Sequence, residues 1–157
     1  MKSTIHYLIA FVLFAGLVFG QATKNSDDRR KAILDYQLTM PRANQLIAAL
    51  DAMTKYVVSL PDFAERMRKS AQMTPAEQIA QMEKDPKAAD ILKRNQLTAR
   101  DYLVGVPALR MALLAASGVP EGPTVIASPG NIAFAKANLS VLKPKMDAAD
   151  GVGARRQ

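Results

Sequence analysis

Two groups of polar and aromatic residues in the second half of the chain are of the types that line a ligand pocket. Asp101 and Tyr102 stand where one predicted helix begins, and Asn131 and Phe134 stand where the last one begins. Side by side, the two helix starts would turn a carboxylate, an amide and two aromatic rings toward one space. The alternative is structural: Asp101 and Asn131 cap their helices, and the two rings fill the core with the tyrosine hydroxyl at a polar edge.

Arg110 is a fifth candidate ligand-binding residue, because it is the one cation in the apolar run from Leu103 to Ala116. A buried guanidinium needs a carboxylate or several carbonyl oxygens as partners. Its aliphatic stem can equally lie along apolar surface while the charged head stays in water. We favour the second arrangement and predict Arg110 at the surface.

The chain lacks the residue types on which most enzyme and metal chemistry depends. It has no cysteine, and its single histidine, His6, lies in a predicted leader. This excludes thiol nucleophiles, Ser-His triads, structural disulfides and the usual zinc or haem ligands from the mature protein. Carboxylates do not recur at a spacing that fixes a metal or sets a general acid beside a base. We therefore predict no catalysis, no metal site and no cofactor.

Methionine is the remaining soft ligand. Seven of the eight methionines follow the leader, and clustered thioethers of an exported protein can bind copper(I). These residues are spread along the sequence, so flexible core filling is their predicted use. They are Met40, Met53, Met67, Met73, Met82, Met111 and Met146.

Residues 1–22 have the parts of an export signal. A lysine lies in a short polar start, an apolar run extends from Leu8 to Phe19, and small residues flank a cut after Ala22. Twelve strongly apolar residues cover only about 18 Å of helix, less than the ~30 Å hydrocarbon core of a membrane. We therefore expect a periplasmic or secreted product without a transmembrane segment; removing 22 of the 157 residues leaves 135.

Composition after the leader predicts helices. There are 23 alanines against five aromatic residues, and the β-branched runs typical of strands are nearly absent. Prolines stand mostly where helices begin, a position that tolerates their missing N–H. The prediction is an all-α, compact bundle of five to seven helices in one domain, residues 23–150, followed by a flexible basic tail, residues 151–157. Residues 23–31 are expected to be a mobile start, and residues 34–38 a strap or frayed helix. The predicted helices span residues 41–60, 61–69, 74–84, 86–94, 98–117 and 131–149.

Apolar periodicity predicts which faces of these helices are buried. The first long helix carries a stripe at spacings of four, three and four. The helix over residues 98–117 is apolar on every side, which places it at the centre of the bundle. Pro107 should kink it, Gly118 should end it in the left-handed conformation, and the last helix should bend or break near Pro144. The stripe consists of Leu46, Leu50, Met53 and Val57.

Three threonines, each preceded by a hydrophobic residue, are predicted N-caps: Thr39, Thr74 and Thr98. Their oxygens can accept from free backbone N–H groups. Glu77 completes a capping box after Thr74, and Asp101 fills the same position after Thr98. These segments also resemble the Leu-Thr-x-x-Gln motif of small periplasmic stress chaperones, although the glutamine position after Thr74 holds Glu77 and that after Thr98 holds Asp101. Capping is the interpretation we prefer.

Three different short motifs are spread over most of the mature chain. They are Leu38 to Met40, Gln96 to Tyr102 ahead of the apolar helix, and Asn131 to Phe134 at the start of the last helix. In this order and spacing, the chain resembles a group of uncharacterised, exported bacterial all-helical proteins. The resemblance implies a helical fold and export, and it brings no activity and no binding residue with it.

Together these features predict a non-enzymatic binding or interaction module of the cell envelope, with an unknown peptide, lipid or protein as partner. The alternative is a periplasmic chaperone-like stress protein that shields unfolded clients. The formal charge of +7 suggests nucleic acid as another partner, but acidic residues separate the basic clusters and export argues against gene regulation. We expect no specific nucleic-acid binding, and weak contact with anionic envelope surfaces at most.

Overall fold

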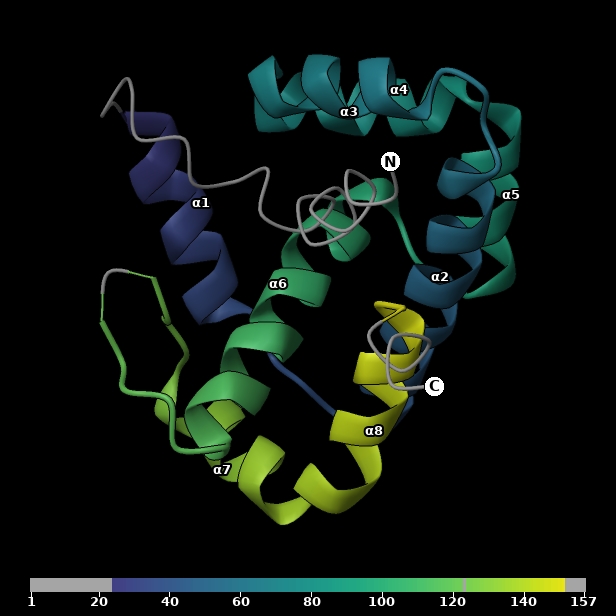
Figure 1. The fold of residues 1–157 in the computed structure, drawn as a ribbon. Helices are drawn as coiled ribbons and strands as arrows, with labels where there is room; N and C mark the ends of the chain where they lie inside the picture. Colours follow the sequence, from purple (N-terminus) through teal and green to yellow (C-terminus); the bar gives the residue numbers. More distant parts are fainter. Residues whose placement is uncertain (1–23, 123, 152–157) are drawn as a thin grey trace, which may run out of the picture.

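The computed structural model describes residues 24–122 and 124–151. Within them the regular structure is entirely helical (Figure 1), as the sequence predicts, and none of the helices reaches the length and hydropathy that a bilayer crossing requires. The predicted leader, residues 1–22, and residues 152–157 of the predicted tail lie outside these ranges. The eight helices are α1 (Lys24–Asp35), α2 (Met40–Val58), α3 (Phe63–Gln72), α4 (Pro75–Lys84), α5 (Pro86–Arg94), α6 (Ala99–Ala116), α7 (Pro129–Ala137) and α8 (Leu139–Ala149).

The described residues form more helices than the predicted five to seven, and the difference arises at two places. Residues 24–35 form α1 where a mobile start and a strap were expected; the buried Ile33 and an ion pair between Lys31 and Asp35 support it. The last predicted helix is divided at Asn138, whose side-chain amide donates to the carbonyl of Phe134 (2.8 Å). An asparagine that bonds the preceding turn competes with helical hydrogen bonding, and the helix divides there rather than near Pro144.

Helix α6 is the hub of the molecule. It packs against α1, α2, α4, α5, α7 and α8, and in Figure 1 it runs obliquely between α1 on one side and α2 on the other. It extends without interruption through Pro107. As predicted, Gly118 then turns the chain away with a φ of 88°, and the N–H of Val119 reaches back to the carbonyl of Leu114 (3.1 Å).

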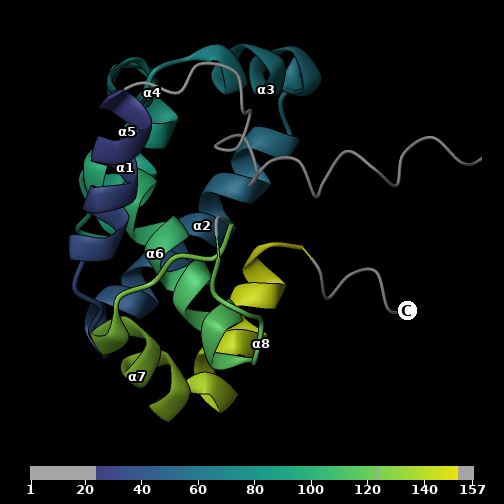
Figure 2. The ribbon, with the colours of Figure 1, turned by 90° about the vertical axis from the view of Figure 1, so that its left-hand side faces the viewer.

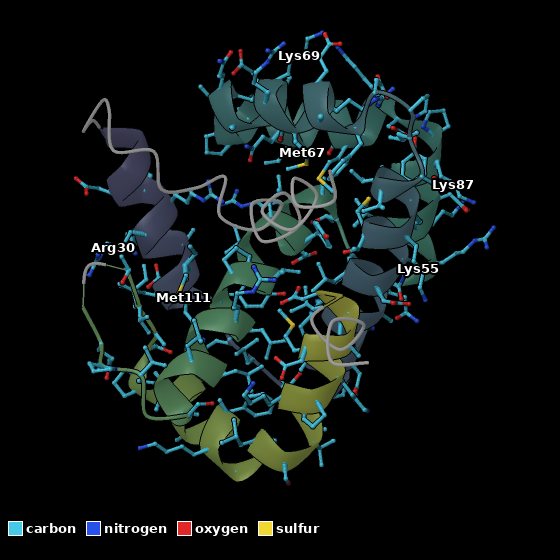
Figure 3. The ribbon with its side chains drawn as sticks, in the orientation of Figure 1. Arg30, Lys55, Met67, Lys69, Lys87 and Met111 are labelled. Atoms are coloured by element: carbon cyan, nitrogen blue, oxygen red, sulfur yellow. The ribbon has the colours of Figure 1, made fainter. Side chains whose placement is uncertain are left out.

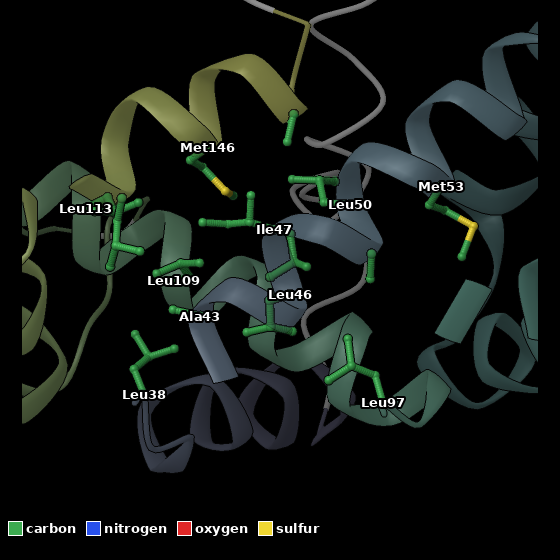
Figure 4. Packing of buried hydrophobic residues seen from close by; sticks show 14 of the residues in the cluster. Leu38, Ala43, Leu46, Ile47, Leu50, Met53, Leu97, Leu109, Leu113 and Met146 are labelled. Carbon is green, nitrogen blue, oxygen red and sulfur yellow. The ribbon is translucent and has the colours of Figure 1, made fainter. Parts of the chain in front are cut away.

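The core lies between α2, α6 and α8 (Figure 4). Three members of the predicted α2 stripe are buried, whereas Val57 is half-buried. Each fully buried leucine stabilises the fold by about 1.5 to 3 kcal/mol relative to an exposed one. The largest fully buried side chains are Leu46, Leu50, Leu109 and Leu142.

Helices α3 and α4 lie across one end of the molecule, as Figure 1 shows. The view turned by 90° places α3 at the outer edge of this layer (Figure 2). Among its ten residues none is buried, and its apolar residues Phe63 and Met67 are half-buried. Helix α3 is therefore the least embedded of the helices that follow α1.

Candidate functional site

A pocket of about 170 Å³ opens between α1, α2, α3, α4 and α6, and we call it the α6 pocket. Its volume is similar to that of the roughly 150 Å³ engineered apolar cavity that holds benzene in another protein. Helix α6 supplies one wall with Tyr102, Leu103, Val106, Pro107 and Arg110. The pocket is thus matched to one ring or a short aliphatic chain.

Three methionines from three helices converge on this pocket: Met53 of α2, Met67 of α3 and Met82 of α4. Figure 3 shows Met67 on the side of α3 that faces the body of the molecule, whereas Lys69 projects away from it. Sequence spacing alone did not reveal this convergence. Thioethers are flexible and polarisable, so they form walls that adapt to the shape of an apolar occupant.

The charged groups of the pocket are all positive. Its lining, as far as the described ranges supply it, includes Arg29 and Arg110 and contains no Asp or Glu. Burial lowers the pKa of Arg29 below its ordinary value. Among the described residues, no carboxylate lies within 4.0 Å of the Arg29 guanidinium.

Arg110 does not lie at the surface, so that prediction was wrong. Its Nη2 atom is 2.7 Å from Oδ1 of Asp150, and the two side chains are only 16% and 12% exposed. Burial raises the pKa of the Asp150 carboxyl, although the neighbouring guanidinium acts in the opposite direction. The partner follows α8 at the end of the chain, forty residues away, where no local sequence pattern signals it.

Pro107 removes one helical hydrogen bond from the part of α6 that lines the pocket. A proline has no N–H, so the carbonyl of the residue four positions earlier, Leu103, lacks its helical donor. Leu103 and Pro107 both line the pocket. Tyr102 is half-buried beside them, and burial raises the pKa of its phenol above its ordinary value, so it is a neutral hydroxyl at physiological pH.

Asp101 serves as a cap, in agreement with the structural alternative. Its carboxylate accepts from the backbone N–H of Thr98 (3.1 Å), and the hydroxyl oxygen of Thr98 accepts from the Asp101 N–H (3.0 Å). The capping box predicted at Thr74 and Glu77 is also present. Asp101 is not among the residues that line the α6 pocket.

Asn131 is buried, but it does not cap its helix. Helix α7 begins earlier than predicted, and Ser128 is the cap, with its oxygen accepting from the Asn131 N–H (3.3 Å). The Asn131 side chain instead accepts from the N–H of Leu38 (3.0 Å) and donates to the carbonyl of Tyr36 (2.7 Å). We call this arrangement the strap clamp, because it fixes the segment between α1 and α2.

The five predicted site residues therefore do not form one site. Tyr102 and Arg110 share the α6 pocket, whereas Asp101 and Asn131 have the structural roles just described. Phe134 is half-buried and packs against the core cluster. Within the described residues, no group of three or more His, Cys, Asp or Glu side chains could hold a metal ion.

One wall of the pocket is fastened by a buried amide. Gln78 of α4 is only 8% exposed, and its Nε2 donates to the carbonyl of Ser70 in α3 (2.9 Å). Ser70 and Gln78 both line the pocket. A second connection joins α3 to the start of α5, because Arg66 lies 3.7 Å from a carboxylate oxygen of Asp85. These polar contacts hold α3 in place without burying any of its residues.

Comparison with family models, curated proteins and solved structures finds no match to this chain. The α6 pocket is therefore the feature of this chain that bears on its function.

Proposed function

We propose that this is an exported, non-enzymatic binding protein of the cell envelope and that the α6 pocket is its ligand site. The observation that carries the proposal is the composition of the lining. Eight of its fifteen lining residues are apolar or carry a thioether, and the other seven are polar, among them Tyr102 and two arginines. Sites for small molecules likewise combine an apolar body with polar groups that orient the ligand.

Two features of the walls support reversible binding. The α3 wall contributes Met67 and Ser70 but contains no buried residue, so its displacement exposes little core. We also propose that α6 bends at Pro107. Such a bend would widen the pocket on the side across from α3. Segments with few buried apolar contacts open at a low free-energy cost.

Export and kinship with the group of exported helical proteins belong to this proposal as well. A protein made in its native host should then begin at Thr23 and occur in the soluble extracytoplasmic fraction. Intact-mass measurement after fractionation checks both expectations. Retention of Met1 in the extracytoplasmic protein contradicts cleavage, and recovery only from the cytoplasm contradicts export.

A chaperone-like role is the weaker alternative. Shielding of unfolded clients calls for a broad apolar surface, and the most exposed large hydrophobic residues in the described part of the chain lie on three different elements. They are Val58 in α2, Val119 in the loop after α6 and Val141 in α8. Single exposed apolar residues are ordinary on soluble proteins, so the pocket is the better-supported site.

The absence of tryptophan allows a direct test with indole as the probe. Indole fluorescence can be followed in this protein without an intrinsic tryptophan background, and an apolar ring should enter the α6 pocket. Val57→Phe narrows the pocket, because Val57 is part of its lining, and should abolish saturable binding. Val58→Phe is the matched control, since Val58 is exposed and adjacent in sequence, and should bind indole as the unaltered protein does.

Thermal unfolding of both variants separates loss of the pocket from loss of the fold. Saturable indole binding that survives in a folded Val57→Phe protein would place the probe elsewhere. No saturable binding to the unaltered protein would contradict the pocket as a site for apolar rings. Suppression of client aggregation that persists in Val57→Phe would favour the chaperone alternative.

A further inference from the structure

We infer that the ligand of the α6 pocket is a small monocarboxylate with an apolar ring or short chain, and that Arg29 binds its carboxylate. The inference rests on the proposed function, because it names the class of ligand for the same site. It depends on three observations: the sign of the charges in the lining, the pairing state of the two arginines and the size of the apolar space.

The charge balance of the lining favours an anion. Among the described residues, two arginines contribute to it and no acidic residue does. Asp150 neutralises one of these charges through its 2.7 Å contact with Arg110. Arg29 has no such partner within 4.0 Å among the described residues. One positive charge therefore remains at the pocket, partly removed from water.

The desolvation of Arg29 supports the same conclusion. Burial lowers the pKa of this guanidinium, which means that its charged form has lost favourable hydration. A cation withdrawn from water is stabilised by an anion with hydrogen-bond acceptors. A carboxylate suits this position well, because its two oxygens match the planar fork of a guanidinium.

A single unmatched cation favours a monoanion over a phosphate. A phosphate monoester carries about −1.5 to −2 charges at neutral pH, so one arginine would leave part of its charge unbalanced. The remaining polar groups of the lining, such as Gln78 and Gln81, are neutral. The pocket volume of about 170 Å³ limits the buried apolar part to a ring or a short chain.

A soft metal ion is the competing occupant of the pocket, because the three converging methionines could bind it through their thioethers. Met53, Met67 and Met82 are neutral ligands of the kind that copper(I) prefers. A metal cation, however, would share the pocket with the charge of Arg29, which has no carboxylate partner within the described residues, and like charges at short range repel. The methionines are accordingly assigned to the apolar wall around the body of the ligand.

Three indole derivatives that differ in charge test the inference. Indole-3-acetate is the anion, indole-3-ethanol the neutral isostere and tryptamine the cation, and all three can be titrated by fluorescence at constant ionic strength. We expect the purified protein to bind indole-3-acetate about tenfold or more tightly than indole-3-ethanol, since hydrogen bonds to a charged partner are strong. Tryptamine should bind more weakly than both.

Substitution at Arg29 should remove the preference for the acid. In Arg29→Gln the affinities for indole-3-acetate and indole-3-ethanol should become nearly equal, and Arg29→Lys should retain an intermediate preference. Arg30→Gln is the matched control: it removes the same charge from the adjacent exposed residue of α1 (Figure 3) and should leave the preference unchanged. A long-range effect of net charge would instead appear equally in both glutamine variants.

The possible failures point to different conclusions. Equal binding of acid and alcohol to the unaltered protein overturns the carboxylate inference but leaves the proposed pocket intact, whereas failure of indole itself contradicts the proposed function. A preference for the acid that persists in Arg29→Gln overturns the assignment of Arg29. Binding of silver(I), a redox-inert probe for copper(I) sites, that displaces indole and is lost in Met67→Leu would overturn the inference in favour of a metal site.

Discussion

Nη2 of Arg110 lies 2.7 Å from Oδ1 of Asp150, and this ion pair joins the hub helix α6 to the residue that caps the C-terminal end of α8. Both side chains are largely withdrawn from solvent. The pair thus closes the last helix onto the core at one edge of the α6 pocket, of which Arg110 is part. A single contact serves both the fold and the pocket.

Removing one partner of this pair should destabilise the protein strongly. Arg110→Met leaves the Asp150 carboxylate buried without its counter-ion, for which we expect a loss of about 3 kcal/mol in unfolding free energy. The double variant Arg110→Met/Asp150→Leu should recover most of that loss, because neither charge then remains. Urea denaturation of the three proteins measures both effects. Equal stabilities of the single and double variants would contradict the unpaired Asp150 carboxylate as the source of the loss.

The strap clamp should contribute more to stability than the adjacent helix cap. Asn131→Ala leaves the buried N–H of Leu38 and the partly buried carbonyl of Tyr36 without their partners, at a cost of about 2 to 4 kcal/mol. Ser128→Ala removes one cap acceptor and should cost about 1 kcal/mol. Chemical denaturation ranks the variants, and the opposite order would mean that the cap, not the clamp, holds α7.

Gly105 is required by close packing. A Cβ atom at this position would lie 2.8 Å from Cδ2 of Leu46 and from Cζ and Oη of Tyr36. Gly105→Ala should therefore destabilise the protein by about 1 to 3 kcal/mol from overpacking, even though alanine is the better helix former. Gly130→Ala provides the control, since nothing lies within 4 Å of its added Cβ, and thermal melts should show it unchanged or slightly stabilised.

The two capping boxes should differ in their importance. Thr98→Ala removes the acceptor at the start of α6 and should cost about 0.5 to 2 kcal/mol. Thr74→Ala should cost less, because α4 has a single buried residue whereas α6 has seven. Thr98→Ser retains the hydroxyl and should stay close to the unaltered protein in the same melts. A neutral Thr98→Ala would mean that the Asp101 carboxylate suffices as a cap.

The pH dependence of stability should include a contribution from Asp85. Burial acts to raise the pKa of this carboxyl, but hydrogen bonds from Tyr56 and from the backbone of Ala88 and Lys87, together with the Arg66 charge, hold it below 3.8. A carboxyl whose pKa is lowered by folding stabilises the protein above the unfolded pKa and loses this effect as pH falls through the folded value.

Asp85→Asn should therefore lower stability at pH 7 more than at pH 2. The asparagine oxygen can still cap α5, so the comparison isolates the charge rather than the cap. Guanidinium denaturation of both proteins at the two pH values provides the measurement. Asp90→Asn is a suitable control, because Asp90 pairs with the exposed Arg94. A deficit for Asp85→Asn that is equal at both pH values would contradict the linkage.

Features that depend on neighbouring residues in the sequence could be predicted. Thr39, Thr74 and Thr98 all cap helices, and Gly118 adopts the left-handed conformation, because turn and cap chemistry involves only a few consecutive residues. The α2 stripe was also visible, since helical periodicity reveals a buried face. The division at Asn138 was missed because neither glycine nor proline marks it.

Features that depend on distant residues could not be predicted. Arg110 was expected at the surface, because the end of α6, the following loop and two helices separate it in sequence from its partner Asp150. The convergence of Met53, Met67 and Met82 depends on how α2, α3 and α4 pack, which their spacing does not encode. Arg29 was assigned to a mobile start because α1 is too polar to show an apolar stripe. The α6 pocket thus arises from tertiary packing.

The strap clamp also affects the order in which parts of the chain can fold during synthesis. Its partners are separated by 93 and 95 residues, so the segment after α1 cannot be secured until Asn131 has left the ribosome. At 5 to 20 residues per second, this leaves an interval of roughly 5 to 20 s. During that time the N-terminal part of the nascent polypeptide stays untethered, accessible to whatever factors meet it as it emerges.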